Sequence, residues 1–228
     1  MPKPFEKLTT EQLLARLDKI IFKQLHIHHT WRPNKSNFDG TNHSKLQDGM
    51  YNYHTKTNGW TDIGQHVTLF PDGTFLTGRA FDVSPASIKG WNTGAFAVEM
   101  LGDFDTGHEK LEGAQKESIL ALARYFLKKY GESTIKFHRE GPDVTKTCPG
   151  SGIDKTAFMK EAKLMGTIFK DVPDTRWSAK YIKAAKDLDI IRGDSDGNFR
   201  PEGYITREEA AVLIIRTYEK ITGKKVTE

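Results

Sequence analysis

The chain has 228 residues, of which 37% are hydrophobic and 28% are charged, and its formal net charge is +4 at pH 7. This composition excludes an intrinsically disordered chain, and the length allows one medium-sized domain together with a small one. The basic residues form no tail or stripe and no apolar run has the length of a membrane span, so we expect neither nucleic acids nor a membrane as partners.

Four segments in the first half of the chain have the patterns of regular structure. A capping-box pattern from Thr9 to Gln12 predicts the start of a helix, and alternating polar and apolar residues predict strands. The predicted elements are a helix over 9–21, a strand over 25–30, a hairpin with strands over 62–70 and 74–77 and a turn at 71–73, and a strand over 95–101. The polar residues 32–59 predict a long surface loop with a short helix around 46–53.

The second half of the chain continues this alternation and then changes in composition near Gly166. Its predicted elements are a helix over 113–130, a strand over 135–137, a helix over 154–165, a helix over 177–188, a turn at 193–198 and a helix that begins after Thr206. Alternating strands and helices predict an α/β or α+β fold with a central sheet. We expect one domain over 1–165 and a small all-α module over 166–228, with a linker at about 164–168.

The only cysteine, Cys148, lies in a polar loop that ends at Pro149 and Gly150. A single cysteine excludes an internal disulfide, and we expect synthesis in a reducing compartment. His138 precedes Cys148 by ten residues, which is within reach of one loop. A cysteine and a histidine so arranged are candidate metal ligands.

A histidine from the strand over 25–30 could complete the three protein ligands that a catalytic zinc site uses. His26 and His28 share one face of that strand, and His29 is adjacent. Spacing alone therefore leaves the choice among these three histidines open.

Two charged residues near these candidates indicate catalysis. Glu99 lies between apolar neighbours in a predicted strand, where a carboxylate is costly unless it is paired or used. The alternative is a strand edge with Glu99 facing water. Lys146 stands two residues before Cys148 and could direct its ammonium at an oxyanion beside a metal. The alternative is an ordinary solvated lysine.

Five stretches, in their order and spacing, carry a resemblance to a known family. They are Ile27-His28-His29-Thr30, Asp62-Ile63-Gly64-Gln65-His66, Pro71-Asp72-Gly73-Thr74 with Gly78-Arg79, Trp91-Asn92-Thr93-Gly94 leading into Val98-Glu99, and the loop from His138 to Gly150. Over roughly residues 20–160 the chain resembles the type 2 N-acetylmuramoyl-L-alanine amidases, which include phage lysozyme-like amidases and peptidoglycan recognition proteins. The resemblance implies a central mixed β-sheet flanked by helices.

The resemblance also implies roles for individual residues. It places one zinc ion on His28, His138 and Cys148, and so selects His28 from the three candidate histidines. It makes Glu99 the catalytic acidic residue and Lys146 the residue that stabilises the oxyanion.

The substrate groove is less well defined by the resemblance. Many members have a tyrosine where this chain has Gln65, and members that use the strand glutamate can lack that tyrosine. Gln65 is therefore expected to contact substrate or water. The other candidates for substrate binding are His66, Arg79, Trp91 and Asn92.

Motifs in the C-terminal segment carry a second resemblance. They are Phe169-Lys170-Asp171-Val172, Trp177, Tyr181-Ile182, Gly193, the run from Asp196 to Pro201, and the run from Ile205 to Ala210. The segment is similar to an S-layer homology repeat, which implies binding of a secondary cell-wall polymer through Arg207 and Trp177. Such repeats usually act in threes, and this chain has one copy, so we expect a monomer or a trimer assembled through this module.

Together the resemblances imply zinc-dependent hydrolysis of the amide between N-acetylmuramic acid and L-alanine in bacterial peptidoglycan, with lysis of the cell wall as by an endolysin or autolysin. The alternatives are a non-catalytic peptidoglycan-binding protein and an amidase that recycles soluble muropeptides. Residues 1–11 lack the apolar core and cleavage site of a signal peptide. We therefore expect synthesis in the bacterial cytoplasm and action at the wall after release.

Overall fold

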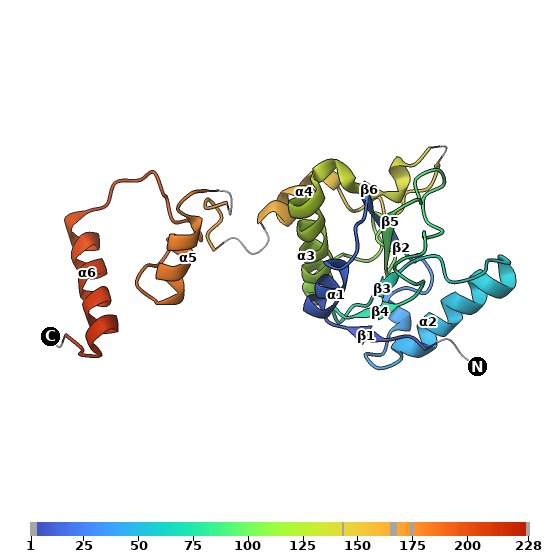
Figure 1. Cartoon of the computed structure of the whole chain (residues 1–228), viewed down its shortest axis with the longest axis horizontal. Helices are drawn as coiled ribbons and strands as arrows, with labels where there is room; N and C mark the ends of the chain where they lie inside the picture. The colour runs from blue at the N-terminus through green and yellow to red at the C-terminus, as the bar shows by residue number, and fades with distance from the viewer. Residues whose placement is uncertain (1–3, 143, 165–167, 174–175, 227–228) are drawn as a thin grey trace. The chain divides into compact units, whose positions relative to one another are not determined.

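The computed structural model describes residues 4–142, 144–164, 168–173 and 176–226. The chain divides into two compact units, Met1–Lys163 and Leu164–Glu228, which are labelled by element in Figure 1. Residues 165–167, which include the end of the predicted helix over 154–165 and most of the predicted linker, lie outside the described residues. No helix of the described residues combines the length and the apolar character that crossing a membrane requires.

The first unit is built on a six-stranded sheet with the strand order β1-β4-β3-β5-β2-β6. The strands are β1 (Lys7–Leu8), β2 (Gln24–His29), β3 (Val67–Leu69), β4 (Phe75–Thr77), β5 (Ala95–Met100) and β6 (Ile135–Phe137). The four strands β3, β5, β2 and β6 are parallel, and β4 and β1 continue the sheet antiparallel. The expectation of a mixed central sheet is confirmed.

Four α-helices accompany the sheet: α1 (Thr10–Leu17), α2 (His43–Asn52), α3 (Gly113–Tyr130) and α4 (Lys155–Leu164). Figure 1 shows α3 along one side of the strands with α1 beside it, and α2 on the other side. Short 3-10 turns lie at Lys35–Asn37, Glu132–Thr134 and His138–Glu140, and a π-helical turn, Tyr53–Thr57, continues α2.

Alternation along the strands assigns the two faces of the sheet. Phe96 of β5 is fully buried and its ring stacks near that of Phe126 in α3, with ring centroids 6.2 Å apart. The α3 side is therefore the hydrophobic core. Because side chains alternate along a strand, Glu99 and its register partner His28 lie on the opposite face. The functional candidates of β2 and β5 thus share one face.

The sequence predicted several elements to the residue. The helix over 113–130 and the strand over 135–137 are found with those bounds, and the capping box at Thr9 is formed. Of the strand predicted over 62–70, only Val67–Leu69 pairs in the sheet. Residues before it are held by loop contacts instead, as where the Gly64 N–H donates to His54 Nδ1 at 3.2 Å.

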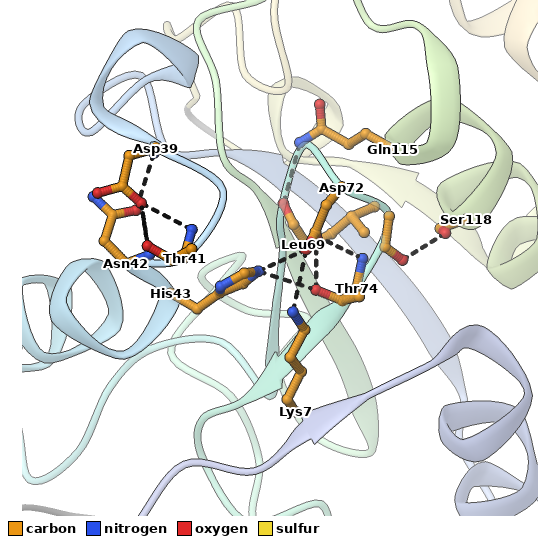
Figure 2. Close-up of polar contacts among 11 residues, drawn as sticks. Lys7, Asp39, Thr41, Asn42, His43, Leu69, Asp72, Thr74, Gln115 and Ser118 are labelled. Carbon is orange, nitrogen blue, oxygen red and sulfur yellow. Dashed lines mark hydrogen bonds and ion pairs between the residues drawn. The ribbon is translucent and has the colours of Figure 1, made fainter.

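The polar segment 32–59 holds more structure than predicted, because α2 begins at His43 and spans ten residues. Figure 2 shows why its start is fixed: Asp72, at the turn between β3 and β4, accepts hydrogen bonds from both His43 and Lys7. Apolar side chains add to this, since Phe38 and Leu46 pack on a cluster made by Phe70, Leu76 and Leu101.

The β3–β4 turn is also tied to α3. The Ser118 hydroxyl donates to the Gly73 carbonyl at 2.7 Å, and the Gln115 amide donates to the Leu69 carbonyl at 3.1 Å (Figure 2). Gly73 has φ +82°, and a Cβ there would lie 2.9 Å from Ala114. Only glycine fits this turn without strain. α2, which leads to the pocket described below, is therefore anchored at its start.

The second unit contains α5 (Ala179–Asp187) and α6 (Arg207–Thr222), and no strand is assigned among its described residues. A small core joins Phe169, Val172, Ala179 and Ile182, against which Ile168, Ile191 and Phe199 pack. The predicted capping box at Thr206 is formed, and the predicted helix over 177–188 begins two residues later, at Ala179.

Candidate active site

A pocket of about 1060 Å³ opens on the face of the sheet opposite to α3. β2 and β5 supply its floor, the segments 30–33 and 49–60 supply one wall, and the loop over 145–148 supplies another. All three predicted metal ligands line it, together with Glu99 and Lys146.

His28, His138 and Cys148 converge in this pocket. One ligand atom from each residue lies within 4.8 Å of the others. The Cys148 Sγ is 3.6 Å from Nδ1 of His28, and the rings of His28 and His138 have centroids 4.5 Å apart. A search of the described residues for three or more histidine, cysteine or acidic side chains that could hold a metal ion finds His28, His138 and Cys148.

The donor set fits zinc. Two imidazole nitrogens and one thiolate are typical zinc ligands, and three protein ligands leave a fourth position for water or substrate. Ligand distances of 2.0–2.3 Å in a tetrahedral site separate neighbouring ligand atoms by about 3.3–3.8 Å. The 3.6 Å between Cys148 Sγ and His28 Nδ1 lies within that range.

Backbone contacts position Cys148. Its Sγ accepts a hydrogen bond from the His29 N–H at 3.4 Å, and its carbonyl accepts one from the Arg139 N–H at 2.8 Å. The Arg139 guanidinium donates to the carbonyls of Gly150 and Ile153, which closes the loop between His138 and Cys148. Sequence reasoning missed Arg139, although its place beside His138 was a usable signal.

Burial governs the protonation of the candidate ligands. It lowers the pKa of His28 well below the ordinary value, and it also lowers the pKa of His138, so both imidazoles are neutral at pH 7. The same burial raises the pKa of the Cys148 thiol to about 12. In the metal-free protein Cys148 is therefore a protonated thiol.

Zinc binding is expected to release at least one proton per ion at pH 7. Zinc binds the thiolate, so Cys148 must lose its proton, whereas the neutral histidines lose none. Calorimetric titration of the metal-free protein with zinc, repeated in buffers of different ionisation enthalpy, measures this number. A result of zero would contradict the protonation state assigned to Cys148.

Glu99 lies in register between His28 of β2 and Thr68 of β3. Removal from water raises the pKa of its carboxyl to about 7, an effect that the nearby Lys146 ammonium partly offsets. A carboxyl group with a pKa near 7 can both accept and return a proton at neutral pH, which is the property of a general base. Lys146 is exposed and lines the same pocket.

The predicted substrate residues divide into two groups. Gln65 lines the pocket, is buried, and donates from Nε2 to Thr68 Oγ1 at 2.8 Å. Its Oε1 has no hydrogen-bond partner among the described residues. The Gln65 side chain is thus held by Thr68, whose register partner in β5 is Glu99.

The other four candidates do not line this pocket and have partners elsewhere. His66 is fully buried between the Val83 carbonyl and the Ala97 N–H, and Arg79 donates to the carbonyls of Ile63 and Ser84. Asn92 accepts from the N–H groups of Ser87 and Ile88, and the Trp91 ring lies under the Lys136 ammonium. These contacts stabilise loops around the sheet.

Exposed aromatic residues form much of the pocket wall. Trp31, Tyr53 and Trp60 have 57%, 58% and 39% of their surface exposed, far more than apolar rings in a core. Sequence reasoning missed them because Tyr53 lies within the segment 32–59, which was interpreted as a polar loop, and Trp31 and Trp60 lie at its two ends. Large rings inside and at both ends of an otherwise polar segment were the available signal.

The two polymer-binding candidates lie in the second unit. Trp177 is 80% exposed and its ring meets that of Tyr181 edge-on, while Arg207 is exposed at the first position of α6. Both side chains are thus available to a partner.

Comparison with known proteins identifies both units. Residues 18–151 match the family model described as N-acetylmuramoyl-L-alanine amidase, and residues 168–211 match the model described as S-layer homology domain. An endolysin of Escherichia phage T7 is 30% identical over 97 residues, which cover 41% of this chain and 63% of the endolysin. The S-layer protein of Bacillus licheniformis is 40% identical over 63 residues, which cover 26% of this chain and 7% of that protein.

The chain therefore spans less than two thirds of the length of either relative. Among solved structures, the N-acetylmuramoyl-L-alanine amidase LysC from Clostridium intestinale URNW is similar, with a TM-score of 0.50 and 23% identity. The match covers 70% of this chain and 90% of LysC, and it supports the same fold.

Proposed function

The chain belongs to the N-acetylmuramoyl-L-alanine amidase family, and from this premise we propose that it is a zinc-dependent hydrolase of bacterial peptidoglycan. Its substrate is the amide between the lactyl group of N-acetylmuramic acid and L-alanine of the stem peptide. The observation that carries the proposal is the convergence of His28, His138 and Cys148 in one pocket with Glu99.

The shape and lining of the pocket suit a glycopeptide. Its volume of about 1060 Å³ is at the upper end of ordinary ligand sites, as a branched sugar–peptide substrate requires. Trp31, Tyr53 and Trp60 offer apolar ring faces on which sugar rings can stack. Gln65 lines the same pocket, and its contact with substrate or water stays a prediction.

Glu99 is the proposed general base. When bound, zinc lowers the pKa of a bound water toward about 7 and polarises the scissile carbonyl. Glu99 accepts the proton of the attacking water and returns it to the nitrogen of the departing L-alanine amine. In the metal-free fold burial raises the pKa of the Glu99 carboxyl to about 7, which brings it toward the range that suits both transfers.

Lys146 is the proposed electrostatic partner of the scissile carbonyl. It lines the pocket near enough to Glu99, His28 and His138 to shift the pKa of each. Its ammonium can donate to the carbonyl oxygen as negative charge develops there.

Lys146→Met is expected to lower kcat by about 100- to 1000-fold, the typical effect of losing one oxyanion donor. KM changes little, because the lost interaction strengthens only in the transition state. Lys128→Met, which changes an exposed lysine of α3 outside the pocket, serves as the control. A rise in KM with kcat unchanged would instead assign Lys146 to substrate binding.

The second unit is proposed to hold the enzyme at the wall. Arg207 and Trp177 are its candidates for contact with an anionic secondary cell-wall polymer, because a guanidinium and an exposed ring suit charged sugars. A module that localises the chain on the wall favours an enzyme acting on intact sacculi, as an endolysin or autolysin does. Monomeric or trimeric assembly through this module stays a prediction.

Incubation with purified sacculi tests the proposed function. New alanine N-termini should accumulate, a chelator should stop their release, and added zinc should restore it. New reducing sugar ends without new alanine N-termini would identify a glycosidase. Binding to sacculi with neither product would identify a non-catalytic peptidoglycan-binding protein, and turnover confined to soluble fragments would identify a recycling amidase.

A further inference from the structure

We propose that Ser87 is a positioning residue that fixes the ring orientation and tautomer of His28, with His26 and Gln24 behind it. This inference rests on the metal site of the proposed function. The Ser87 hydroxyl oxygen lies 2.5 Å from Nε2 of His28 and 3.0 Å from Nδ1 of His26. At the far end, Nε2 of His26 lies 2.9 Å from Oε1 of Gln24. The four side chains form one continuous chain of hydrogen bonds.

The direction of each bond follows from the metal ligand. Nδ1 is the nitrogen of His28 that faces Cys148, at 3.6 Å, so its lone pair is the one offered to a metal. Nε2 of a neutral His28 then carries the hydrogen and donates to the Ser87 oxygen. Ser87 has one hydrogen of its own, which it donates to Nδ1 of His26.

The remaining bond is compatible with this order. If Nδ1 of His26 accepts, Nε2 of the neutral ring must carry the hydrogen and needs an acceptor. The atom facing it is Oε1 of Gln24, which can only accept. Donors and acceptors therefore alternate correctly from His28 to Gln24 when Nδ1 of His28 is left free for the metal. The opposite tautomer of His28 would carry its hydrogen on the nitrogen that faces Cys148.

The loop that carries Ser87 is held on both sides. The Asn92 side chain accepts from the N–H groups of Ser87 and Ile88 at 3.1 and 2.9 Å, and the Ala86 N–H donates to the Gly64 carbonyl at 3.0 Å. The hydroxyl is thereby placed beside a strand 59 residues earlier in the chain. Asn92, predicted from sequence as a substrate contact, supports this placement.

The chain also assigns a role to His26. His26 shares a sheet face with His28 but is fully buried, and both of its ring nitrogens are engaged, by Ser87 and Gln24. His26 therefore has no ring nitrogen available to bind a metal. Its Nδ1 accepts the hydrogen bond that the Ser87 hydroxyl donates. Partners behind a metal-bound histidine fix its tautomer, and their removal typically weakens metal binding about 10- to 100-fold.

Zinc affinity provides the first test, measured by competition with a chromophoric chelator on the full chain. Ser87→Ala should bind zinc about 10- to 100-fold more weakly than the wild type. Ser84→Ala, in the same loop but exposed, should bind as the wild type does. Equal affinity of Ser87→Ala and the wild type would overturn the proposal, whereas failure of the wild type to bind zinc would overturn the proposed function itself.

Nitrogen NMR of the imidazole rings provides a second test that needs no variant. In the metal-free wild type, His28 and His26 should both carry their hydrogen on Nε2. In Ser87→Ala, His28 should become a mixture of tautomers. A wild-type His28 with its hydrogen on Nδ1 would overturn the proposal even if Ser87→Ala failed to fold.

Discussion

Replacing Glu99 by glutamine is expected to lower kcat by about 10²- to 10⁴-fold, the usual contribution of a general base. The amide has nearly the shape of the carboxyl group but cannot take the proton of the attacking water. Because Glu99 is not one of the three candidate ligands, Glu99→Gln should keep its zinc and its fold.

Glu117→Gln, on the exposed side of α3, is a matched control that should keep full activity. The measurement is the initial rate of alanine N-terminus release from sacculi, with zinc content determined on the same samples. A Glu99→Gln enzyme within tenfold of the wild type would remove Glu99 from the mechanism.

The raised pKa of Glu99 also has consequences for pH. Burial raises the carboxyl pKa from its ordinary 4.5 to about 7 in the metal-free fold, so the folded state binds a proton that the unfolded state has lost between these values. Stability of the metal-free wild type therefore decreases as pH rises from about 4.5 through 7. Glu99→Gln removes the cost of burying an ionised carboxylate. Its metal-free form should therefore melt at a higher temperature than the metal-free wild type at pH 8 but not at pH 4, as measured by differential scanning calorimetry.

His138→Ala is expected to abolish both stoichiometric zinc binding and turnover. It removes one of three ligands, which leaves two donors for a site that needs at least three. Zinc affinity should fall by more than the factor of about 10 to 100 that is typical when only a hydrogen-bond partner of a ligand is removed. Metal analysis after dialysis, together with the rate on sacculi, measures both effects.

His54→Ala is the matched control for zinc content. His54 lines the same pocket and stacks on Trp60, but it is not part of the converging group. This variant should retain one zinc ion per chain. If His138→Ala also retained one zinc ion, His138 would not be a ligand.

Regular elements and part of the candidate ligand set were within reach of the sequence because their patterns are local. The 3.6-residue period over 113–130 and the alternation over 95–101 each depend on one face being buried, and the structure has both elements. His138 and Cys148 lie on one loop, so their spacing carries information about distance. The choice of His28 over His26 needed the family resemblance, since both point to the same face of β2.

Contacts between distant segments could not be predicted in the same way. Ser87 meets His28 only because the loop after β4 returns to β2, and no local pattern encodes that path. For the same reason Asn92 and Arg79 looked like ligand contacts, although their side chains hold backbone groups of neighbouring loops. A polar residue that supports a loop and one that touches substrate give the same sequence signal.

Hydrolysis of sacculi in ¹⁸O-labelled water, followed by mass spectrometry of the products, tests the central claim most directly. The account predicts one ¹⁸O atom in the lactyl carboxylate of N-acetylmuramic acid and stem peptides that begin with unlabelled L-alanine bearing a free amine. Label at a sugar anomeric carbon or in a peptide carboxylate, with the lactyl–alanine amide intact, would contradict it.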